Sequence, residues 1–353
     1  MSFEYLLTPT QLGEITIKNR VLMAPMTRSR ANADGTANAL MQTYYAQRAN
    51  AGLIITEGTQ PSENGQGYCR TPGIHSIEQT ESWQQVTSQV AEKGGSMVMQ
   101  IMHCGRIAST HNKSSDAQTV APSQIQAKGQ IYTDSHGMMD FDVPRELTIA
   151  EIEDVIDEYR VAAKNAIDAG FQGVELHATS GYLPAQFLST GTNKRTDRYG
   201  GNVLNRVKFV EELLLAMSNE VGAGRVGLRI CPGNPFNDLH DENVEETFST
   251  LLSRIDDIGL AYLHVIRMSP KITGVDTIAL AQEYFSGPIV ANDSYTFEEA
   301  EELVREGSVA AISFARHYIS NPNLVDKLKS GEPLTPFNPK LLYTPGPEGY
   351  TDY

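Results

Sequence analysis

Short apolar runs alternate with longer amphipathic segments along most of the 353-residue chain. Some of the short runs, such as 53–55 (Leu-Ile-Ile) and 97–99 (Met-Val-Met), are apolar at every position. This pattern is typical of parallel strands that are covered on both faces. Strands are predicted at residues 21–24, 53–56, 96–101, 173–177, 226–230, 262–266, 288–291 and 310–314.

The segments between these strands carry helical signals. Thr148 and Glu151 have the spacing of a capping box, and Ile152, Val155 and Tyr159 continue an apolar stripe at helical spacing. Helices are predicted at residues 79–93, 148–170, 203–221, 243–258, 296–306 and 321–329.

Eight strands separated by helices predict an α/β fold, a (β/α)₈ TIM barrel. The alternative, a doubly wound sheet, usually carries a Gly-rich dinucleotide turn after an early strand, and this chain has none. We expect a single domain over residues 1–353. The alternation of Leu12, Ile15 and Ile17 predicts a short N-terminal hairpin or lid, and the long polar insertion at 103–145 predicts an excursion of the rim after the third strand.

The composition narrows the choice of partners and compartment. The formal net charge of −15 argues against a nucleic-acid partner and against an anionic membrane surface. The N-terminus lacks the pattern of a secretory signal, and no apolar run is long enough to span a bilayer. Three scattered cysteines and eight scattered histidines without H-E-x-x-H spacing predict no metal site. The odd, sparse cysteine count fits a reducing compartment, so we expect a cytoplasmic protein.

The stretch 172–201 places reactive side chains directly after a predicted strand. The apolar alternation of Val174 and Leu176 runs into His177, and Tyr182 follows five positions later. In α/β barrels the carboxyl ends of the strands carry the active site. The sequence therefore predicts an imidazole and a phenol on one rim of the barrel.

Other strands end in residues with more than one interpretation. Thr27 is either a turn residue or a ligand contact, and Gly58 either makes a turn or lets a planar ligand approach the backbone. Gln100 either holds loops together or pairs with a ring edge such as a flavin pyrimidine. Arg229, inside an apolar strand, needs an acceptor, which is either a carboxylate such as Glu175 or an electron-rich ligand atom.

The last two strands end where barrels of this kind usually bind phosphate. The seventh is followed by Asn292, Asp293 and Ser294, and the eighth by Ala315 and Arg316. The guanidinium of this arginine suits bidentate binding of a phosphate, with a surface ion pair as the alternative.

Together these segments resemble the old yellow enzyme family of flavin-dependent ene-reductases. The motifs that carry the resemblance are A-P-M-T-R at 24–28, Q-I-M-H-x-G-R at 100–106, H-x-x-S-G-Y-L at 177–183, R-T-D-x-Y-G-G at 195–201 and an arginine after the eighth strand. Each motif alone is weak, but the set in this order is very specific. The resemblance covers essentially the whole chain, to the E-G-Y-T-D-Y tail at 348–353.

The resemblance implies FMN lying across the mouth of the barrel, with NADPH or NADH as the hydride donor. Thr27 would hydrogen-bond flavin O4 and adjust the reduction potential, Gln100 would pair with the pyrimidine edge, and Arg229 would stabilise the reduced flavin electrostatically. The residues implied to bind FMN are Pro25, Met26, Thr27, Gly58, Gln100, His177, Arg229, Asn292, Asp293, Ser294, Ala315 and Arg316.

It also implies a ping-pong reduction of the C=C bond of activated alkenes such as enones, nitroalkenes and maleimides. Hydride would pass through flavin N5 to the β-carbon. His177 and Ser180 would hydrogen-bond the activating oxygen, while Tyr182 would protonate the α-carbon as general acid. The implied substrate pocket consists of Tyr68, Met102, His177, Ser180, Tyr182 and Tyr343. Phenolic ligands are expected inhibitors, and a monomer or homodimer is expected.

Four residues depart from the family pattern. Ser180 stands where asparagine or histidine is usual and reaches less far, and Met102 replaces a tryptophan found in many relatives, which should widen or soften the pocket. Asp293 replaces a small residue and Ala315 replaces glycine, and both bear on FMN affinity.

Two alternative functions follow from the same residues. A flavin-binding barrel with little ene-reductase turnover is conceivable because the hydroxyl of Ser180 would be a weaker clamp. A phosphate-binding barrel lyase would need a Schiff-base lysine or a metal cluster, and the predicted strand ends carry no lysine.

Overall fold

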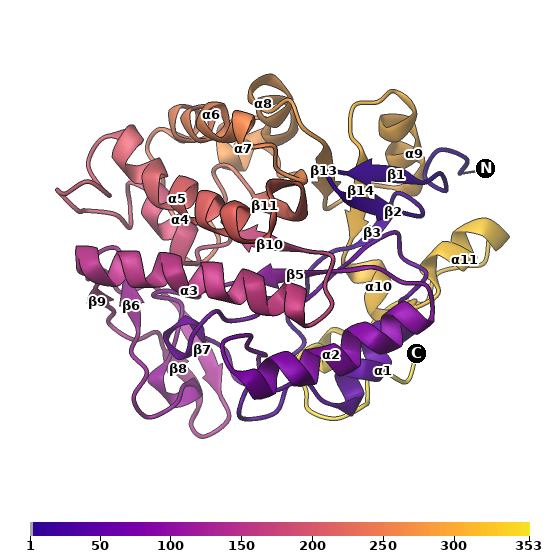
Figure 1. Ribbon diagram of the computed structural model, residues 1–353, viewed down its shortest axis with the longest axis horizontal. Helices are drawn as coiled ribbons and strands as arrows, with labels where there is room; N and C mark the ends of the chain where they lie inside the picture. Colours follow the sequence, from indigo (N-terminus) through magenta and orange to yellow (C-terminus); the bar gives the residue numbers. More distant parts are fainter. Residues whose placement is uncertain (1–2) are drawn as a thin grey trace.

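The computed structural model describes residues 3–353, which fold around a closed parallel barrel of eight strands (Figure 1). Each strand pairs with the next in the order β10-β11-β12-β13-β14-β3-β4-β5, and β5 pairs with β10 to close the barrel. The strands are β3 (Val21–Met23), β4 (Ile54–Ile55), β5 (Met97–Ile101), β10 (Gly173–His177), β11 (Val226–Ile230), β12 (Tyr262–Ile266), β13 (Ile289–Asn292) and β14 (Ala311–Phe314). The predicted TIM barrel is confirmed.

Helices surround the barrel and cover its outer face (Figure 1). Their long members begin at the predicted signals: in α3 the Thr148 hydroxyl accepts from Glu151 N at 3.2 Å, and the Glu151 carboxylate accepts from Thr148 N at 2.8 Å. The α-helices are α1 (Ala39–Gln47), α2 (Ile77–Glu92), α3 (Ile149–Asp168), α4 (Leu183–Leu188), α5 (Val203–Val221), α6 (Val244–Ile255), α7 (Pro270–Thr273), α8 (Thr277–Tyr284), α9 (Phe297–Arg305), α10 (Arg316–Ser320) and α11 (Leu324–Ser330). In the described part of the chain, no helix combines the length and apolar character needed to cross a bilayer.

The predicted N-terminal hairpin is present and closes one end of the barrel. Strands β1 (Thr10–Leu12) and β2 (Ile15–Ile17) pair antiparallel. Their buried side chains Leu12, Ile15 and Ile17 form one apolar cluster with residues at the amino ends of the barrel strands. That cluster also contains Leu22, Leu53, Ile55, Val98, Ala261, Tyr262, Val290 and Ala311. Because the hairpin fills the amino end, the carboxyl end is the open one.

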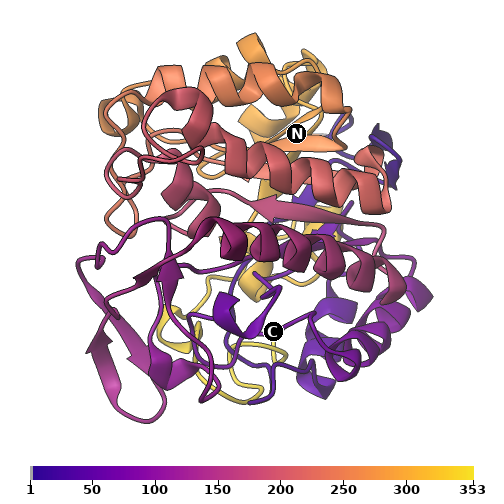
Figure 2. The same cartoon turned by 60° about the vertical axis from the view of Figure 1, so that its left-hand side comes forward.

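The excursion after β5 is more regular than the sequence suggested. Strand β6 (Val120–Ala121) pairs with β9 (Arg145–Glu146), while β7 (Gln130–Thr133) and β8 (Gly137–Asp140) form an antiparallel hairpin that projects from the rim. Figure 2 shows this hairpin, in purple, beside the yellow C-terminal segment. The prediction of a rim excursion did not include this hairpin, whose sequence signal is the alternation in β7, where Ile131 and Thr133 are buried between exposed neighbours.

Candidate active site

A cavity of 980 Å³ opens on the rim that is opposite to the N-terminal hairpin. Eight of the predicted site residues line it: Pro25, Met26, Thr27, Tyr68, Tyr182, Ala315, Arg316 and Tyr343. The sequence analysis missed other lining residues, among them Tyr132 and Met138 of the β7–β8 hairpin and Phe236 and Asn237 after β11. Several of these missed side chains are large and apolar, so the mouth of the cavity is bordered by aromatic and thioether groups.

His177 and Tyr182 lie together, as predicted. His177 ends β10, and its ring centroid is 5.0 Å from that of Tyr182. The Tyr182 hydroxyl lies 3.2 Å from the hydroxyl of Tyr68, which comes from the segment after β4. Both His177 and Tyr182 are largely buried, with exposed fractions of 7% and 8%. The three side chains therefore form one polar cluster, of which Tyr68 and Tyr182 line the cavity.

The protonation states of this cluster follow from its burial. Desolvation, reinforced by the nearby Arg229 guanidinium, lowers the pKa of His177 to about 3. Desolvation also raises the pKa of Tyr182 well above its ordinary value, with the neighbouring Tyr68 adding to the shift. At neutral pH the imidazole is neutral and the phenol keeps its proton. Each is an uncharged hydrogen-bond donor.

Ser180 sits in the turn between these two residues. Its φ of +58° is in the left-handed region, which non-glycine residues adopt uncommonly. Its carbonyl accepts a hydrogen bond from Asn237 Nδ2 at 2.7 Å, which holds the turn. Its hydroxyl makes no hydrogen bond to the described residues. The turn that presents Tyr182 is thus fixed through the backbone.

Arg229 has a buried guanidinium with only one protein acceptor. It lies beside His177 in the register of β10 and β11 and is 7% exposed. Its Nη2 donates to Asn292 Oδ1 at 2.7 Å, while Nε and Nη1 are buried without a partner. The alternative of a direct pair with Glu175 is wrong, because Arg229 makes no ion pair within residues 3–353. Unpaired buried donors are costly, so this site fits an electron-rich ligand atom.

Glu175 instead forms a buried hydrogen-bond network with residues of strands β5 and β12. Its carboxylate accepts from Gln100 Nε2 at 2.7 Å and from Tyr262 Oη at 3.1 Å, and it lies 2.8 Å from His264 Nδ1. Burial opposes its ionisation, but His264, Arg229 and Gln100 outweigh burial and lower its pKa. The anion is therefore the countercharge for the guanidinium. The amide nitrogen of Gln100 is engaged here, which leaves its Oε1 without a hydrogen bond to the described residues.

The predicted phosphate region is split between buried and exposed residues. Asn292 is buried and accepts the hydrogen bond from Arg229. Asp293 and Ser294 are exposed and have φ values of +71° and +57°. Arg267, which the sequence analysis missed, donates through Nη2 to the carbonyl of Ser294. Arg316 is exposed at the start of α10 and forms no ion pair with any described residue, so the surface ion pair considered for it is wrong.

Gly58 has a packing role that is visible without a ligand. A Cβ at this position would lie 2.5 Å from both Sδ and Cε of Met102. No real Cβ tolerates such a contact, so a side chain at position 58 requires Met102 to move. The bare glycine and the methionine that replaces the family's tryptophan are therefore packed against each other.

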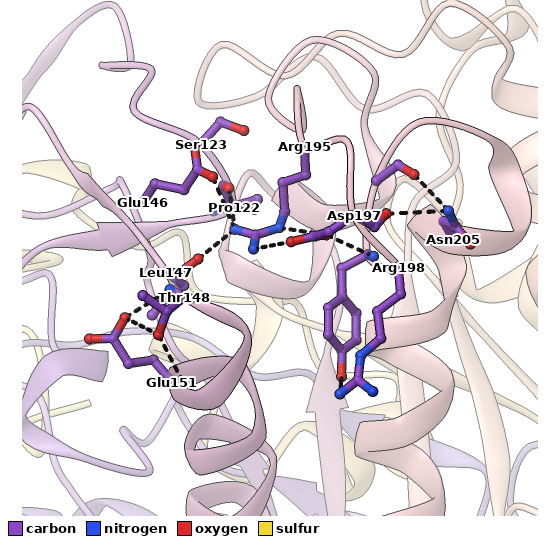
Figure 3. A network of polar contacts seen from close by, with 12 residues as sticks. Pro122, Ser123, Glu146, Leu147, Thr148, Glu151, Arg195, Asp197, Arg198 and Asn205 are labelled. Atoms are coloured by element: carbon purple, nitrogen blue, oxygen red, sulfur yellow. Dashed lines mark hydrogen bonds and ion pairs between the residues drawn. The ribbon is translucent and has the colours of Figure 1, made fainter.

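The R-T-D-x-Y-G-G motif anchors the excursion rather than lining the cavity (Figure 3). Arg195 is nearly fully buried, and its Nη1 donates to the carbonyls of Pro122 at 2.9 Å and Leu147 at 2.6 Å. Its other nitrogens pair with both carboxylate oxygens of Asp197, at 3.1 and 2.5 Å. One guanidinium thus joins the loop after α4 to Pro122 within the excursion and to Leu147 just after it.

Comparisons with known proteins agree with this geometry. The model of the NADH:flavin oxidoreductase / NADH oxidase family matches residues 5–335. A relative from Leishmania infantum, described as a probable flavin mononucleotide-dependent alkene reductase, is 37% identical over 359 residues that cover 100% of this chain and 98% of its own.

Solved structures are similar over nearly the whole chain. The old yellow enzyme homologue from Zymomonas mobilis has 37% identity and a TM-score of 0.94, covering 99% of both chains. Morphinone reductase in complex with tetrahydroNAD has 37% identity and a TM-score of 0.92, covering 99% of this chain and 96% of its own. TcOYE with pHBA has 36% identity and a TM-score of 0.95, covering 99% of both chains.

The barrel, the cavity and these similarities define an FMN-dependent oxidoreductase. The chain belongs to the NADH:flavin oxidoreductase / NADH oxidase family, the family of the old yellow enzymes. Its cofactor is FMN, and its hydride donor is a reduced nicotinamide.

Proposed function

We propose that the protein uses NADPH or NADH to reduce the C=C bond of enones, nitroalkenes and maleimides, in a single FMN-binding domain over residues 1–353. The observation that carries this proposal is the juxtaposition of His177, Tyr182 and the partly unpaired Arg229 at the carboxyl ends of neighbouring strands. A neutral donor, a protonated phenol and a buried cation are the groups that this chemistry requires.

Bound FMN would supply hydride transfer between the nicotinamide and the β-carbon of the alkene. Arg229 stabilises the negative charge that accumulates during flavin reduction, with Asn292 and the Glu175 carboxylate fixing its orientation and charge balance. Thr27 and the Oε1 of Gln100 supply hydrogen bonds to the ring edges.

The substrate oxygen is held by neutral donors. His177 donates a hydrogen bond to the carbonyl or nitro oxygen and withdraws electron density from the alkene, with the Ser180 hydroxyl as a second, shorter donor. Tyr182 gives its proton to the α-carbon, and its hydrogen-bond partner Tyr68 orients it. Tyr343 and Met102 complete the pocket by packing against the alkene.

The phosphate of FMN is assigned to Arg316 and to the backbone amides of residues 292–294. The exposed arginine without an ion pair supports this assignment. Asp293 is exposed, and its carboxylate makes no contact that would hold it over the phosphate. Pro25, Met26, Gly58 and Ala315 complete the binding surface as small or apolar contacts.

Phenolic compounds should compete with the alkene, because a phenolate oxygen would take the place of the substrate oxygen at His177. The similarity to TcOYE, which is known with pHBA, supports this expectation. The protein is proposed to act in the cytoplasm as a monomer or homodimer.

Anaerobic half-reactions test the proposal. Purified protein should be yellow or become yellow with FMN, bleach on mixing with NADPH or NADH, and regain its colour on mixing with cyclohexenone or maleimide. Protein that bleaches but is not reoxidised by any enone, nitroalkene or maleimide would be a flavin-binding barrel without ene-reductase turnover. A colourless preparation that cannot be reconstituted would point to a barrel lyase.

A further inference from the structure

A buried carboxyl group lies among the residues assigned to FMN, and the reaction described above does not use it. Glu57 follows β4 and directly precedes Gly58, and it is 1% exposed. Its Oε2 accepts a hydrogen bond from the backbone N–H of Arg28 at 3.3 Å. Arg28 is the next residue after Thr27. The carboxyl group therefore braces the backbone of one proposed flavin contact and is adjacent in sequence to another.

The contacts of Glu57 continue into helix α1. Its Oε1 accepts from Tyr45 Oη at 3.2 Å, and the same phenol oxygen accepts from Glu57 N at 3.1 Å. Tyr45 and Glu57 thus hold each other through two hydrogen bonds. Among residues 3–353, no cation donates directly to the carboxylate, because the guanidinium of Arg28 donates to Tyr44 Oη and to carbonyls of the C-terminal segment.

Charged and titratable groups face Glu57 from three segments. Arg28 and Arg30 lie after β3, and both favour its ionisation. Tyr45 comes from α1 and Tyr350 from the C-terminal segment, while Tyr44 of α1 and Arg48, the C-cap residue of that helix, lie beside them. The tyrosine Tyr350 stacks on Tyr44 with ring centroids 4.1 Å apart, and Arg28 lies over both rings.

Opposing effects bring the pKa of Glu57 close to neutral pH. Burial strongly disfavours the carboxylate, and the hydrogen bonds from Arg28 N and Tyr45 only partly offset it, so the pKa rises to about 7. A buried carboxylate with two neutral hydrogen bonds and no direct ion pair is costly, which explains the direction of the change. Of the tyrosines around it, Tyr45 and Tyr350 have pKa values raised well above the ordinary value, so they stay neutral.

We propose that Glu57 is a positioning residue that holds the backbone at Thr27 and Arg28 against the flavin, and that its negative charge lowers the flavin's reduction potential. This inference rests on the proposed FMN site. Ionised Glu57 accepts the Arg28 N–H as a charge-assisted hydrogen bond, which is stronger than the bond to a neutral acid. Its charge also opposes the negative charge that reduction adds to the ring.

The sign of the pH effect follows from linkage. Below pH 7 Glu57 is neutral and leaves the potential unchanged, whereas above pH 7 it is ionised and makes reduction harder. Conversely, reduction of the flavin raises the proton affinity of Glu57, so reduction takes up an extra fraction of a proton just above neutral pH. The midpoint potential should therefore fall more steeply with pH in that interval than on either side of it.

The test is the midpoint potential of the FMN-loaded protein, measured by anaerobic dye equilibration from about pH 5.5 to about pH 9. Glu57→Gln keeps the size of the side chain and one acceptor oxygen for the Arg28 N–H, whereas its amide nitrogen can donate to Tyr45 Oη; the side chain cannot ionise. Its potential should match that of the wild type at the acid end and lack the steep interval. At the alkaline end it should be higher by about 30 mV for each tenfold rise in proton affinity that reduction causes at Glu57.

Two further variants distinguish the effect of the Glu57 charge from an effect of the substitution on folding. Tyr45→Phe removes a hydrogen bond that stabilises ionised Glu57, so the steep interval should move to higher pH. If Glu57→Gln binds no FMN, the result for Tyr45→Phe decides whether Glu57 has the proposed role. Glu158→Gln is the matched control, because burial also raises the pKa of Glu158 but this residue of α3 makes no hydrogen bond to residues 25–28. It should follow the wild type at every pH.

Failure is distinguishable from failure of the proposed function. If wild-type protein binds FMN and reduces alkenes but Glu57→Gln gives a parallel curve at all pH values, the role of Glu57 is overturned while the function stands. The role of Glu57 is likewise overturned if Tyr45→Phe leaves the steep interval of the midpoint potential at the wild-type pH. If the wild-type protein binds no FMN, the function and the inference fall together.

Discussion

The sharpest prediction concerns Tyr182→Phe. The change removes one hydroxyl and leaves the ring, which is 8% exposed and packed against His177. The lost hydroxyl has one hydrogen-bond partner among the described residues, Tyr68 Oη, at the long distance of 3.2 Å. Losing such a bond costs about 1 kcal/mol of stability, so the variant should fold and bind FMN.

The expected effect on chemistry is much larger. A positioned general acid contributes about 100-fold to 10,000-fold to the rate, which corresponds to about 3–5 kcal/mol of barrier height. Reduction of the flavin by NADPH uses no proton from Tyr182 and should proceed at the wild-type rate. Reduction of cyclohexenone should slow by the full factor, because its α-carbon no longer receives the proton.

Stopped-flow absorbance of the two half-reactions separates these effects. Tyr68→Phe is the matched control: it removes the other hydroxyl of the same pair, lines the same cavity and should slow alkene reduction far less. Because burial raises the pKa of Tyr182 well above its ordinary value, the wild-type rate of alkene reduction should show no loss from its ionisation up to about pH 9. Unchanged half-reactions in Tyr182→Phe, or the larger loss in Tyr68→Phe, would refute the assignment of the proton donor.

The other predictions concern packing, anchoring and the substrate clamp. Gly58→Ala should cost roughly 1–3 kcal/mol in thermal unfolding because its Cβ meets Met102, and adding Met102→Ala should recover most of the loss; additive costs would contradict the contact. Arg195→Ala should lower stability by roughly 2–4 kcal/mol and expose residues 103–145 to limited proteolysis while FMN stays bound, and an uncut excursion would argue against the anchor. Ser180→Asn should tighten the binding of phenols in a titration of flavin absorbance, because asparagine tolerates the left-handed backbone and reaches further; equal or weaker binding would contradict the clamp.

The sequence predicts the barrel well because parallel strands that are buried on both faces appear as short, continuous apolar runs. The bounds predicted for β10, β11 and β12 agree with the structure at both ends. Helix α1 was missed because its buried residues Tyr44, Tyr45 and Ala46 are consecutive, so no single apolar stripe marks it. Helix α1 also packs against the C-terminal segment, where Tyr350 stacks on Tyr44. No pattern in the sequence near α1 indicates this contact.

Sequence reasoning located cavity residues at the strand ends and missed those that distant loops contribute. The rule that barrels use the carboxyl ends of their strands predicts the positions of Thr27, His177 and Arg229 but leaves open whether Thr27 is a turn residue or a ligand contact. Phe236 and Asn237 reach the cavity only because the loop after β11 folds back over β10, and nothing in their neighbourhood in the sequence announces this. The partner of Arg229 was also beyond sequence reasoning, since Asn292 is 63 residues away.

The anchoring of the excursion at Arg195 has a consequence for how such enzymes diversify. The loop that carries Arg195 is attached to the chain on either side of the β7–β8 hairpin, because the guanidinium donates to the carbonyls of Pro122 and Leu147. Backbone carbonyls are the same whatever the side chains are. A chimera that takes the stretch between these two carbonyls from a relative would keep this attachment and change the residues of β7 and β8 that line the cavity.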